Sequence, residues 1–390
     1  MKIAYVTTYD VFNQATWLSN QLGLCQAGYH IAKTLSQNNT SLHYIGNLQK
    51  RFSVLTRLKW SIYRFLLKKD YYRWAEPLVV KDYSHQVNVR LAKINPDLVI
   101  CTENVIPIAY LKSNWPIVLW TDATLGSLIN FYPHLTNLCQ ETANNIYKIE
   151  KAALERCKLA IYTSEWAAET AIDIYSINPS KIKVVPWGAN IECNRNIDDI
   201  KYLLKLRPYN SCKLLFFGTE WFRKGGDIAL AVTQELNSRG LNTQLTVVGC
   251  ETVSNKPLPK FANVLGYIDK YSQSGQERIN QLLSNSHFII LPSKAETYGH
   301  VFCEANSFGV PCLATNVGGI PTVIKNGLNG KTFTTDANIA EYCDYIISLM
   351  TDYQEYTKLA ISSFKEYQTR LNWGVACQEV KNLLIDLIGR

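Results

Sequence analysis

The chain has 390 residues and a formal net charge of +8, and 47% of its residues are hydrophobic against 18% that are charged. These values are typical of a soluble globular protein, and the length favours two domains over one core. No uncharged apolar run is long enough to cross a bilayer, which argues against a membrane-spanning protein. The 11 cysteines show no paired spacing, and the chain opens on a strand-like sequence with no signal peptide. We therefore expect reduced thiols and a cytoplasmic protein.

The first half of the chain alternates strand-like and helix-like stretches. A strand at residues 2–7 precedes a long polar loop and a helix at residues 24–35. Further strands are expected at residues 42–45, 97–102, 116–121 and 159–163, with helical stretches between them. This alternation predicts an α/β domain built on a parallel, doubly wound sheet.

Three positions in this half are candidates for a functional site. Glu103 and Asp122 each follow a predicted strand, so both should lie at the carboxyl edge of the sheet and face a crevice between domains. Asp122 could take a proton from a substrate hydroxyl, or it could cap a loop. Trp17, in the first loop, could stack on a sugar or a lipid, or it could pack in the core.

The positive charge of the chain is concentrated between Lys50 and Arg73. This segment has eight Lys or Arg against one Asp, and so carries +7 of the formal +8. Apolar residues recur at helical spacing between the basic ones, at Leu55, Leu58, Ile62, Phe65 and Leu66. Such a helix could contact the inner face of an anionic membrane or a phospholipid-linked acceptor. Alternatively, the apolar stripe packs on its own domain and the basic face is solvated. Nucleic-acid binding is not expected, because no recognition motif accompanies the basic residues.

The second half restarts the same alternation. Strands are expected at residues 213–217, 244–248, 263–266, 288–291 and 311–315, which predicts a second parallel, doubly wound sheet. We place the boundary in a polar linker, which gives domains at residues 1–190 and 191–372. A last helix is expected from Trp373 to about residue 388.

Two cations, Arg223 and Lys224, precede a helix that is expected to begin at Gly226. Cations at this end oppose the helix dipole, so their position is favourable if an anion binds there. Arg can bind a phosphate with two hydrogen bonds, whereas Lys acts as a point charge. Gly225 and Gly226 would let the backbone approach the anion closely. The alternative is an exposed basic turn.

Two carboxylates flank the start of another expected helix, at residues 298–308. Glu296 lies in the loop after the strand at residues 288–291, and Glu304 lies on the second helical turn, from which its side chain leans back toward the same pocket. The amide groups expected to bind an anion at this helix start are those of Tyr298, Gly299, His300 and Val301. Carboxylates repel phosphate but accept hydrogen bonds from sugar hydroxyls, so the combination suits a sugar nucleotide. The alternative is that both acids are solvated surface residues.

The same residues carry a family resemblance. Residues 292–321 resemble the signature of retaining glycosyltransferases of family four, glycosyl transferases group 1, with two glutamates separated by seven residues. Residues 216–230 resemble the phosphate-contacting loop of this family, and residues 162–190 resemble its interdomain segment. The resemblance covers most of the chain. It implies two Rossmann-like domains facing across a cleft, the GT-B fold, with the nucleotide sugar on the second domain. The acceptor would bind on the first domain, on the side of Trp17, Glu103 and Asp122. In this family the last helix crosses back, so residues 373–390 would pack on the first domain.

The resemblance also implies an activity and residue roles. The reaction would be a retaining, hexosyltransferase-type transfer from a nucleoside-diphosphate sugar to a hydroxyl of a lipid, a glycan or a small metabolite. Gly218, Arg223 and Lys224 would contact the diphosphate, and the two cations would neutralise it as it leaves. Glu304 would bind the ribose hydroxyls, while Glu296 could orient the sugar hydroxyls. No cofactor or metal is expected, since the chain has no Asp-x-Asp pair and its histidines form no ligand pattern.

The chain departs from the family at three places. Many members have a histidine where Asp122 stands, and many have Trp-Ser-Gly where Trp17 is followed by Leu, Ser and Asn at residues 18–20. Thr322 replaces a common glutamate. Two other functions therefore stay open: a nucleotide-sugar 2-epimerase with the same architecture, and a catalytically idle nucleotide-sugar-binding subunit.

Overall fold

The computed structural model describes residues 1–17, 21–37, 40–251 and 259–389, and it separates into two compact units. Unit 1 comprises Met1–Trp187 with Trp373–Arg390, and unit 2 comprises Gly188–Asn372. The division falls close to the boundary predicted at residue 190, and the C-terminal helix belongs to unit 1. The departure from the family at residues 18–20 lies outside the described residues.

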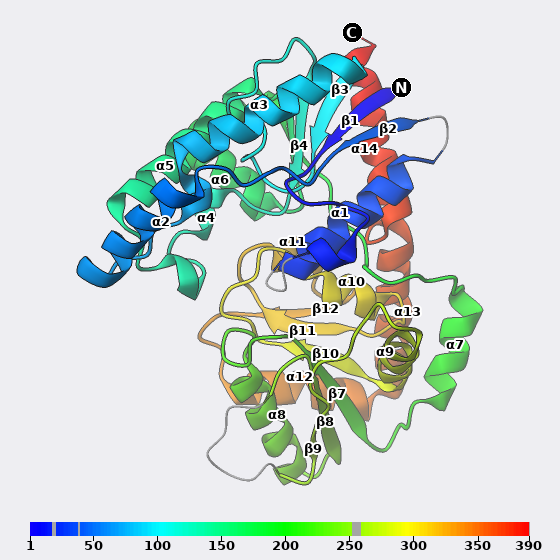
Figure 1. Cartoon of the computed structure of the whole chain (residues 1–390). Helices are drawn as coiled ribbons and strands as arrows, with labels where there is room; N and C mark the ends of the chain where they lie inside the picture. The colour runs from blue at the N-terminus through cyan, green and yellow to red at the C-terminus, as the bar shows by residue number, and fades with distance from the viewer. Residues whose placement is uncertain (18–20, 38–39, 252–258, 390) are drawn as a thin grey trace. The chain divides into compact units, whose positions relative to one another are not determined.

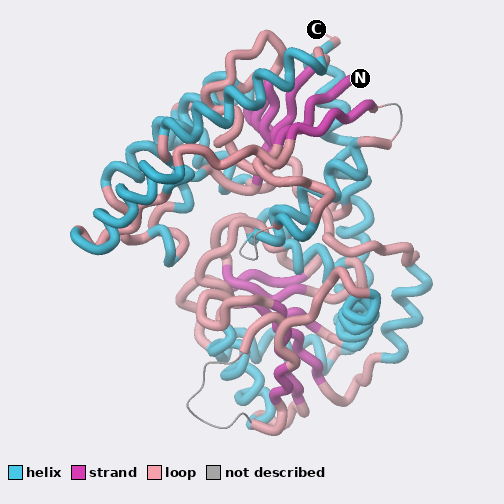
Figure 2. Tube along the Cα trace, viewed as in Figure 1, coloured by secondary structure: helices cyan, strands magenta, loops and turns pink. Residues whose placement is uncertain are grey.

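Unit 1 is built on a six-stranded sheet in which every pairing is parallel (Figures 1 and 2). The order across the sheet is β2-β1-β3-β4-β5-β6. All residues of the three central strands β3, β4 and β5 are buried, as expected for strands covered by helices on both faces. The strands are β1 (Lys2–Val6), β2 (Ser41–Ile45), β3 (Leu98–Cys101), β4 (Ile117–Thr121), β5 (Leu159–Tyr162) and β6 (Ile182–Val184).

The helices of unit 1 include the last helix of the chain. Helix α14 (Trp373–Ile388) packs against α1 (Leu22–Leu35), and the indole of Trp373 stacks on His30 with ring centroids 6.0 Å apart. The other helices are α2 (Ser53–Ser61), a π-helix η3 (Ile62–Leu66), α3 (Pro77–Ile94), α4 (Leu125–Leu128), α5 (Gln140–Arg156) and α6 (Glu165–Tyr175). Short 3-10 turns are η1 (Gln14–Thr16), η4 (Arg73–Ala75), η5 (Pro133–Leu135) and η6 (Pro179–Lys181).

Unit 2 repeats this architecture with the order β12-β11-β10-β7-β8-β9. Its first strand, β7, lies between β8 and β10, which is the strand order of a Rossmann dinucleotide-binding sheet. The strands are β7 (Cys212–Phe217), β8 (Thr243–Val248), β9 (Ala262–Val264), β10 (Phe288–Leu291), β11 (Cys312–Thr315) and β12 (Gly330–Phe333). The helices are α7 (Ile197–Leu206), α8 (Gly226–Ser238), α9 (Gln273–Asn285), α10 (His300–Asn306), α11 (Ile320–Val323), α12 (Ile339–Thr351) and α13 (Tyr353–Thr369).

Four local predictions differ from the structure. The helix predicted at residues 298–308 is shorter, since α10 begins at His300 and ends at Asn306. Gly299 has φ of 93°, a left-handed conformation that cannot be part of the helix, so the helix starts after it. The predicted polar linker contains α7, whose start is stabilised by a capping box between Asn196 and Asp199. Strands β6 and β12 were not predicted, because their sequences, IKV and GKTF, lack the continuous apolar run that marks short strands such as β10.

A buried histidine before β10 makes the stability of unit 2 depend on pH. His287 is fully buried, its Nδ1 accepts from the Lys213 amide at 3.0 Å, and its Nε2 donates to the Pro208 carbonyl at 2.9 Å. Burial, helped by the charge of Arg207, lowers the pKa of His287 to about 3. The folded state therefore holds this ring neutral over most of the acid range.

We expect the free energy of unfolding to fall as the pH falls from about 6.5 toward 3. In this range His287 becomes protonated in the unfolded chain but stays neutral in the folded protein, which favours unfolding. Between about pH 7.5 and about pH 5 this group should contribute a loss of about 2 kcal/mol. Urea unfolding of the wild type and of His287→Gln at both pH values measures it. The difference between the two pH values should shrink in the variant, and an equal difference in both proteins would contradict the assignment.

Candidate functional site

The strand order of unit 2 brings the two predicted donor motifs together. The order reverses between β7 and β10, which pair directly, so the loops leaving both strands emerge side by side at one edge of the sheet. The Lys294 amide donates to the Arg223 carbonyl at 2.8 Å and so joins the loops. Gly225 has φ of 75°, and a Cβ there would lie 2.1 Å from the Pro292 carbonyl oxygen. Only glycine allows this approach.

The two loops meet in a buried ion pair between Lys224 and Glu296. Lys224 is 8% exposed, Glu296 is 7% exposed, and the ammonium donates to Oε2 of the carboxylate. A Cβ at Gly218 would lie 2.9 Å from Cγ of Lys224, so the predicted Gly218 provides room for the lysine side chain. The sequence placed both residues in one site but did not predict that they bind each other. Since the pair is buried, neither residue is a solvated surface group.

Arg223 is also anchored within the site. Its Nη1 donates to the Ala295 carbonyl at 2.8 Å, and its Nε and Nη2 donate to Oε1 of Glu220 at 2.9 and 2.6 Å. The side chain is only 10% exposed, so the alternative of an exposed basic turn is wrong for this residue. Glu220 was not among the predicted site residues, because one acid in a turn is not a signal in the sequence.

Glu304 is held by a lysine that the sequence analysis did not identify. Its side chain is 1% exposed, and both carboxylate oxygens accept from Nζ of Lys270 at 2.7 Å. The same ammonium lies over the ring of Phe217, 4.7 Å from its centroid. Lys270 lies in the loop between β9 and α9, where no motif marks it. The two glutamates are therefore bound by different lysines, although both lie on the segment that follows β10.

The start of α10 lies beside both ion pairs. Tyr298 precedes the helix, so its amide is not part of the first turn, whereas Gly299, His300 and Val301 occupy the cap and the first two helical positions. The His300 side chain binds the Gly188 carbonyl at 3.0 Å, and burial lowers its pKa to about 4, so the ring is neutral at pH 7. The charges of Glu304, Lys270 and Glu296 all act on this ring.

A buried hydroxyl in the same loop lacks a hydrogen-bond partner. Ser293 follows β10 and is fully buried, and its Oγ has no partner among the residues that the structure describes. Leaving such a group unsatisfied costs free energy, which a ligand oxygen or a water could recover. Ser293 therefore joins the candidate site, although a lone serine gave no signal in the sequence.

The candidate residues of unit 1 lie at the carboxyl edge of its sheet or in its first loop. Glu103 follows β3 and is 4% exposed, and its carboxylate accepts from the amide and the hydroxyl of Thr8 at 2.7 and 2.6 Å. Burial raises the pKa of Glu103 above its usual range. Because the sheet order reverses between β1 and β3, this contact joins the two loops at the reversal.

Asp122 and Trp17 have different surroundings. Asp122 follows β4 and is half-buried, as the strand-end prediction requires. Trp17 is buried, its indole donates to the Asp10 carbonyl at 2.9 Å, and its ring packs against Tyr9 and Tyr29. The packing alternative therefore describes Trp17 better than stacking on a ligand.

The described parts of the chain contain neither a metal-binding cluster nor a membrane-spanning helix. Within residues 1–17, 21–37, 40–251 and 259–389, no group of three or more His, Cys, Asp or Glu side chains is arranged to hold a metal ion. Over these same ranges no helix combines the length and the apolar character needed to cross a bilayer.

Known proteins are similar to this chain in sequence and in fold. Residues 206–365 match the family model of glycosyl transferases group 1. A D-inositol 3-phosphate glycosyltransferase of Corynebacterium aurimucosum is 23% identical over 296 residues, which cover 71% of this chain and 68% of the relative. A protein of the same name from Acidothermus cellulolyticus is 29% identical over 183 residues, 44% of this chain and 41% of that relative. Residues 206–365, which form most of unit 2, are therefore similar to glycosyl transferases group 1.

Solved structures show the same architecture over the whole length of the chain. Sucrose-phosphate synthase from Thermosynechococcus elongatus superimposes with a TM-score of 0.67 at 15% identity and covers 100% of this chain and 99% of its own. Anabaena Alr3699/HepE in complex with UDP-glucose superimposes with a TM-score of 0.62 at 16% identity and covers 99% of this chain and 100% of its own. At these identities the likeness concerns the fold, which is the pair of Rossmann-like domains of the GT-B class.

Proposed function

We propose that this chain transfers a glycosyl group from a nucleoside-diphosphate sugar to an acceptor hydroxyl, with retained anomeric configuration and without a metal. One observation carries the proposal: two cations, Arg223 and Lys224, lie at the strand-order reversal of unit 2 beside the buried carboxylate of Glu296. Open α/β sheets bind ligands at this edge. The relatives named as D-inositol 3-phosphate glycosyltransferases, and the neighbour that binds UDP-glucose, support the same class of donor.

The chemistry gives each group a role. Cleavage of the bond between the sugar and the diphosphate places negative charge on the leaving oxygen and positive charge on the anomeric carbon. Arg223, Lys224 and the first amides of α10 would stabilise the leaving diphosphate, which removes the need for a metal. The carboxylate of Glu296 would orient sugar hydroxyls and stabilise the positive charge at the anomeric carbon. Glu304 would bind the ribose, and Lys270 holds its carboxylate in position.

The acceptor would bind on unit 1. Asp122 follows β4 at the carboxyl edge of that sheet, where its carboxylate could accept the proton of the acceptor hydroxyl. If Asp122 does not serve as a base, the leaving diphosphate can take this proton. The acceptor class stays open between a lipid, a glycan and a small metabolite.

Calorimetry with UDP, GDP and ADP, followed by mass spectrometry with the matching sugars, tests the proposal. We expect one diphosphate to bind, and Arg223→Met and Lys224→Met each to weaken its binding by roughly 10- to 100-fold, because each removes a charge-assisted contact to phosphate. Donor consumption should require an acceptor and should continue in EDTA.

Arg239→Met is the matched control. Arg239 lies at the opposite end of α8, where it pairs with Glu235 and Asp344 on the surface, so its loss should leave diphosphate binding unchanged. Unaltered binding in both site variants would refute the donor site. Conversion of the donor with no acceptor present would favour an epimerase, and binding without consumption would favour an idle subunit.

A further inference from the structure

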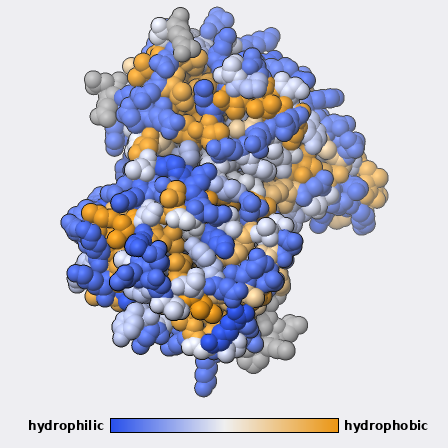
Figure 3. All heavy atoms as spheres, turned by 180° about the vertical axis from the view of Figure 1, so that it is seen from behind, coloured by the Kyte–Doolittle hydropathy of each residue, from blue (hydrophilic) through white to orange (hydrophobic). Residues whose placement is uncertain are grey.

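The basic segment of unit 1 presents its apolar side to solvent. Helix α2 and the π-helix that continues it form one rod at the edge of the unit (Figure 1). Six apolar residues of this rod are between 42% and 80% exposed: Val54, Leu55, Leu58, Ile62, Phe65 and Leu66. Figure 3, which shows the molecule from behind, has apolar atoms at the right edge, where this rod lies. The alternative that this stripe packs on its own domain is therefore wrong.

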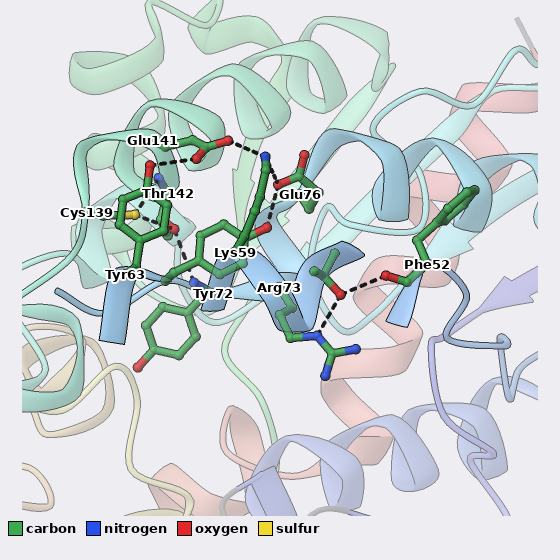
Figure 4. A network of polar contacts seen from close by, with 11 residues as sticks. Phe52, Lys59, Tyr63, Tyr72, Arg73, Glu76, Cys139, Glu141 and Thr142 are labelled. Carbon is green, nitrogen blue, oxygen red and sulfur yellow. Dashed lines mark hydrogen bonds and ion pairs between the residues drawn. The ribbon is translucent and has the colours of Figure 1, made fainter. Parts of the chain in front are cut away.

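The polar side of the rod faces the protein instead (Figure 4). Lys59 donates to Glu76 at 3.1 Å and to Glu141 of α5 at 2.6 Å, and the Tyr63 hydroxyl donates to Glu141 at 2.8 Å. The Lys59 ammonium holds the pKa of the Glu141 carboxyl below its usual range. These contacts attach the rod to η4, α3 and α5 through its charged residues, so its apolar residues are left on the outside.

A second contact fixes the start of the rod. Arg73 donates from Nε to the Thr56 hydroxyl at 2.8 Å, and this hydroxyl in turn donates to the Phe52 carbonyl at 2.9 Å. Thr56 is the one residue of α2 that is buried. An amphipathic helix normally buries its apolar face. Here the polar face packs on the protein instead, so the apolar face is left as a surface that a partner can cover.

Basic side chains surround this apolar surface. Arg57, Arg64, Lys68 and Lys69 are all exposed on or next to the rod, and Lys50 and Arg51 precede it. Asp70 and Asp82 pair with Arg64 and Arg51, and they are the acidic residues that contact these cations in the described structure. The surface thus combines exposed apolar groups with excess positive charge, which complements a surface that is both apolar and anionic.

We propose that α2 and η3 dock this chain on the surface of an anionic phospholipid bilayer. The apolar residues enter the boundary between head groups and acyl chains, and the surrounding Lys and Arg bind lipid phosphates. The exposed indole of Trp60 contacts Phe65 edge to face, and indoles are enriched at membrane interfaces. A protein partner would not require both features, whereas an interfacial helix depends on apolar burial and charge together.

Sedimentation of the full chain with vesicles tests this docking. We expect it to bind vesicles of phosphatidylcholine mixed with phosphatidylglycerol at low salt, and not vesicles of phosphatidylcholine alone. The variant Leu58→Ser/Phe65→Ser/Leu66→Ser should abolish binding without unfolding, because all three side chains are already exposed. Arg57→Glu/Lys68→Glu should weaken vesicle binding by more than 10-fold. Each positive charge removed costs roughly fivefold in affinity, and each negative charge added lowers the affinity further.

Helix α7 of unit 2 offers matched controls. Tyr202 and Leu206 are exposed there to a similar degree, and Lys205 is exposed between them. The variants Tyr202→Ser/Leu206→Ser and Lys205→Glu should bind vesicles as the wild type does. Equal loss in these controls, or no binding of the wild type to anionic vesicles, would overturn the proposal.

Two further measurements distinguish lipid binding by this surface from the binding of a second copy of the chain. Brominated lipids should quench the fluorescence of the wild type, and this quenching should be smaller in Trp60→Phe, which makes the result independent of the triple variant. Light scattering without lipid should show the same mass for the wild type and the triple variant. A dimer that dissociates in the triple variant would assign the surface to a second copy of the chain, and the lipid proposal would then be wrong.

Discussion

Glu296→Gln is expected to lower kcat for sugar transfer by roughly 100-fold or more while the donor KM changes only a few-fold, because a preorganised charge at the reacting carbon acts mainly in the transition state. The substitution keeps the shape of the side chain and removes its charge. Lys224, which now pairs with Glu296, would be left with its ammonium available to the diphosphate. Donor affinity should therefore hold or improve as turnover falls.

Initial-rate kinetics with varied donor measure this split between kcat and KM. Glu235→Gln is the matched control, since the side chain of Glu235 is 41% exposed and pairs with Arg239 at the far end of α8. Its kcat should change only a few-fold. Unchanged kcat in Glu296→Gln would remove this residue from the catalytic groups. A large rise in KM with unchanged kcat would make it a binding residue instead.

Glu304→Gln is expected to raise the donor KM by roughly 10- to 100-fold with little change in kcat, since hydrogen bonds to a charged group contribute about 1.5–3 kcal/mol. The ribose lies away from the reacting carbon, so its contacts should act equally in the ground state and the transition state. The fixed orientation of the carboxylate depends on Lys270, which binds both oxygens at 2.7 Å. Titration of the donor and of its free diphosphate measures the affinity directly.

The Lys270 partner gives a second, independent readout. Lys270→Met leaves the buried carboxylate of Glu304 without its cation, and we expect it to lower the free energy of unfolding by about 3 kcal/mol. The double variant with Glu304→Gln should recover much of this loss, because no unpaired charge remains. Additive losses in the double variant would show that the two side chains do not depend on each other. Unchanged KM in Glu304→Gln would exclude its role at the ribose.

The donor loops show how far the sequence alone could lead. Arg223, Lys224 and Glu296 each follow an apolar strand and precede a helix, which places them at one edge of a parallel sheet. Their assignment to one donor site came from the family resemblance. Lys270 and Ser293 were not predicted, because no sequence motif marks them. Lys270 joins the site through its ion pair with Glu304, and Ser293 through its buried hydroxyl. The late start of α10 was missed because the left-handed conformation of Gly299 is a local property that the periodicity does not contain.

The sequence by itself determined the α/β class, the two parallel sheets and the positions of the cations and acids, because apolar runs and turn residues depend on local physical chemistry. Only the tertiary structure decided which charges pair, Lys224 with Glu296 and Lys270 with Glu304. It also decided the orientation of α2. Periodicity shows that a helix has an apolar and a polar side, but the side that faces the protein depends on the partners available in space. Here Glu76 and Glu141 bind Lys59, and the apolar side therefore faces outward.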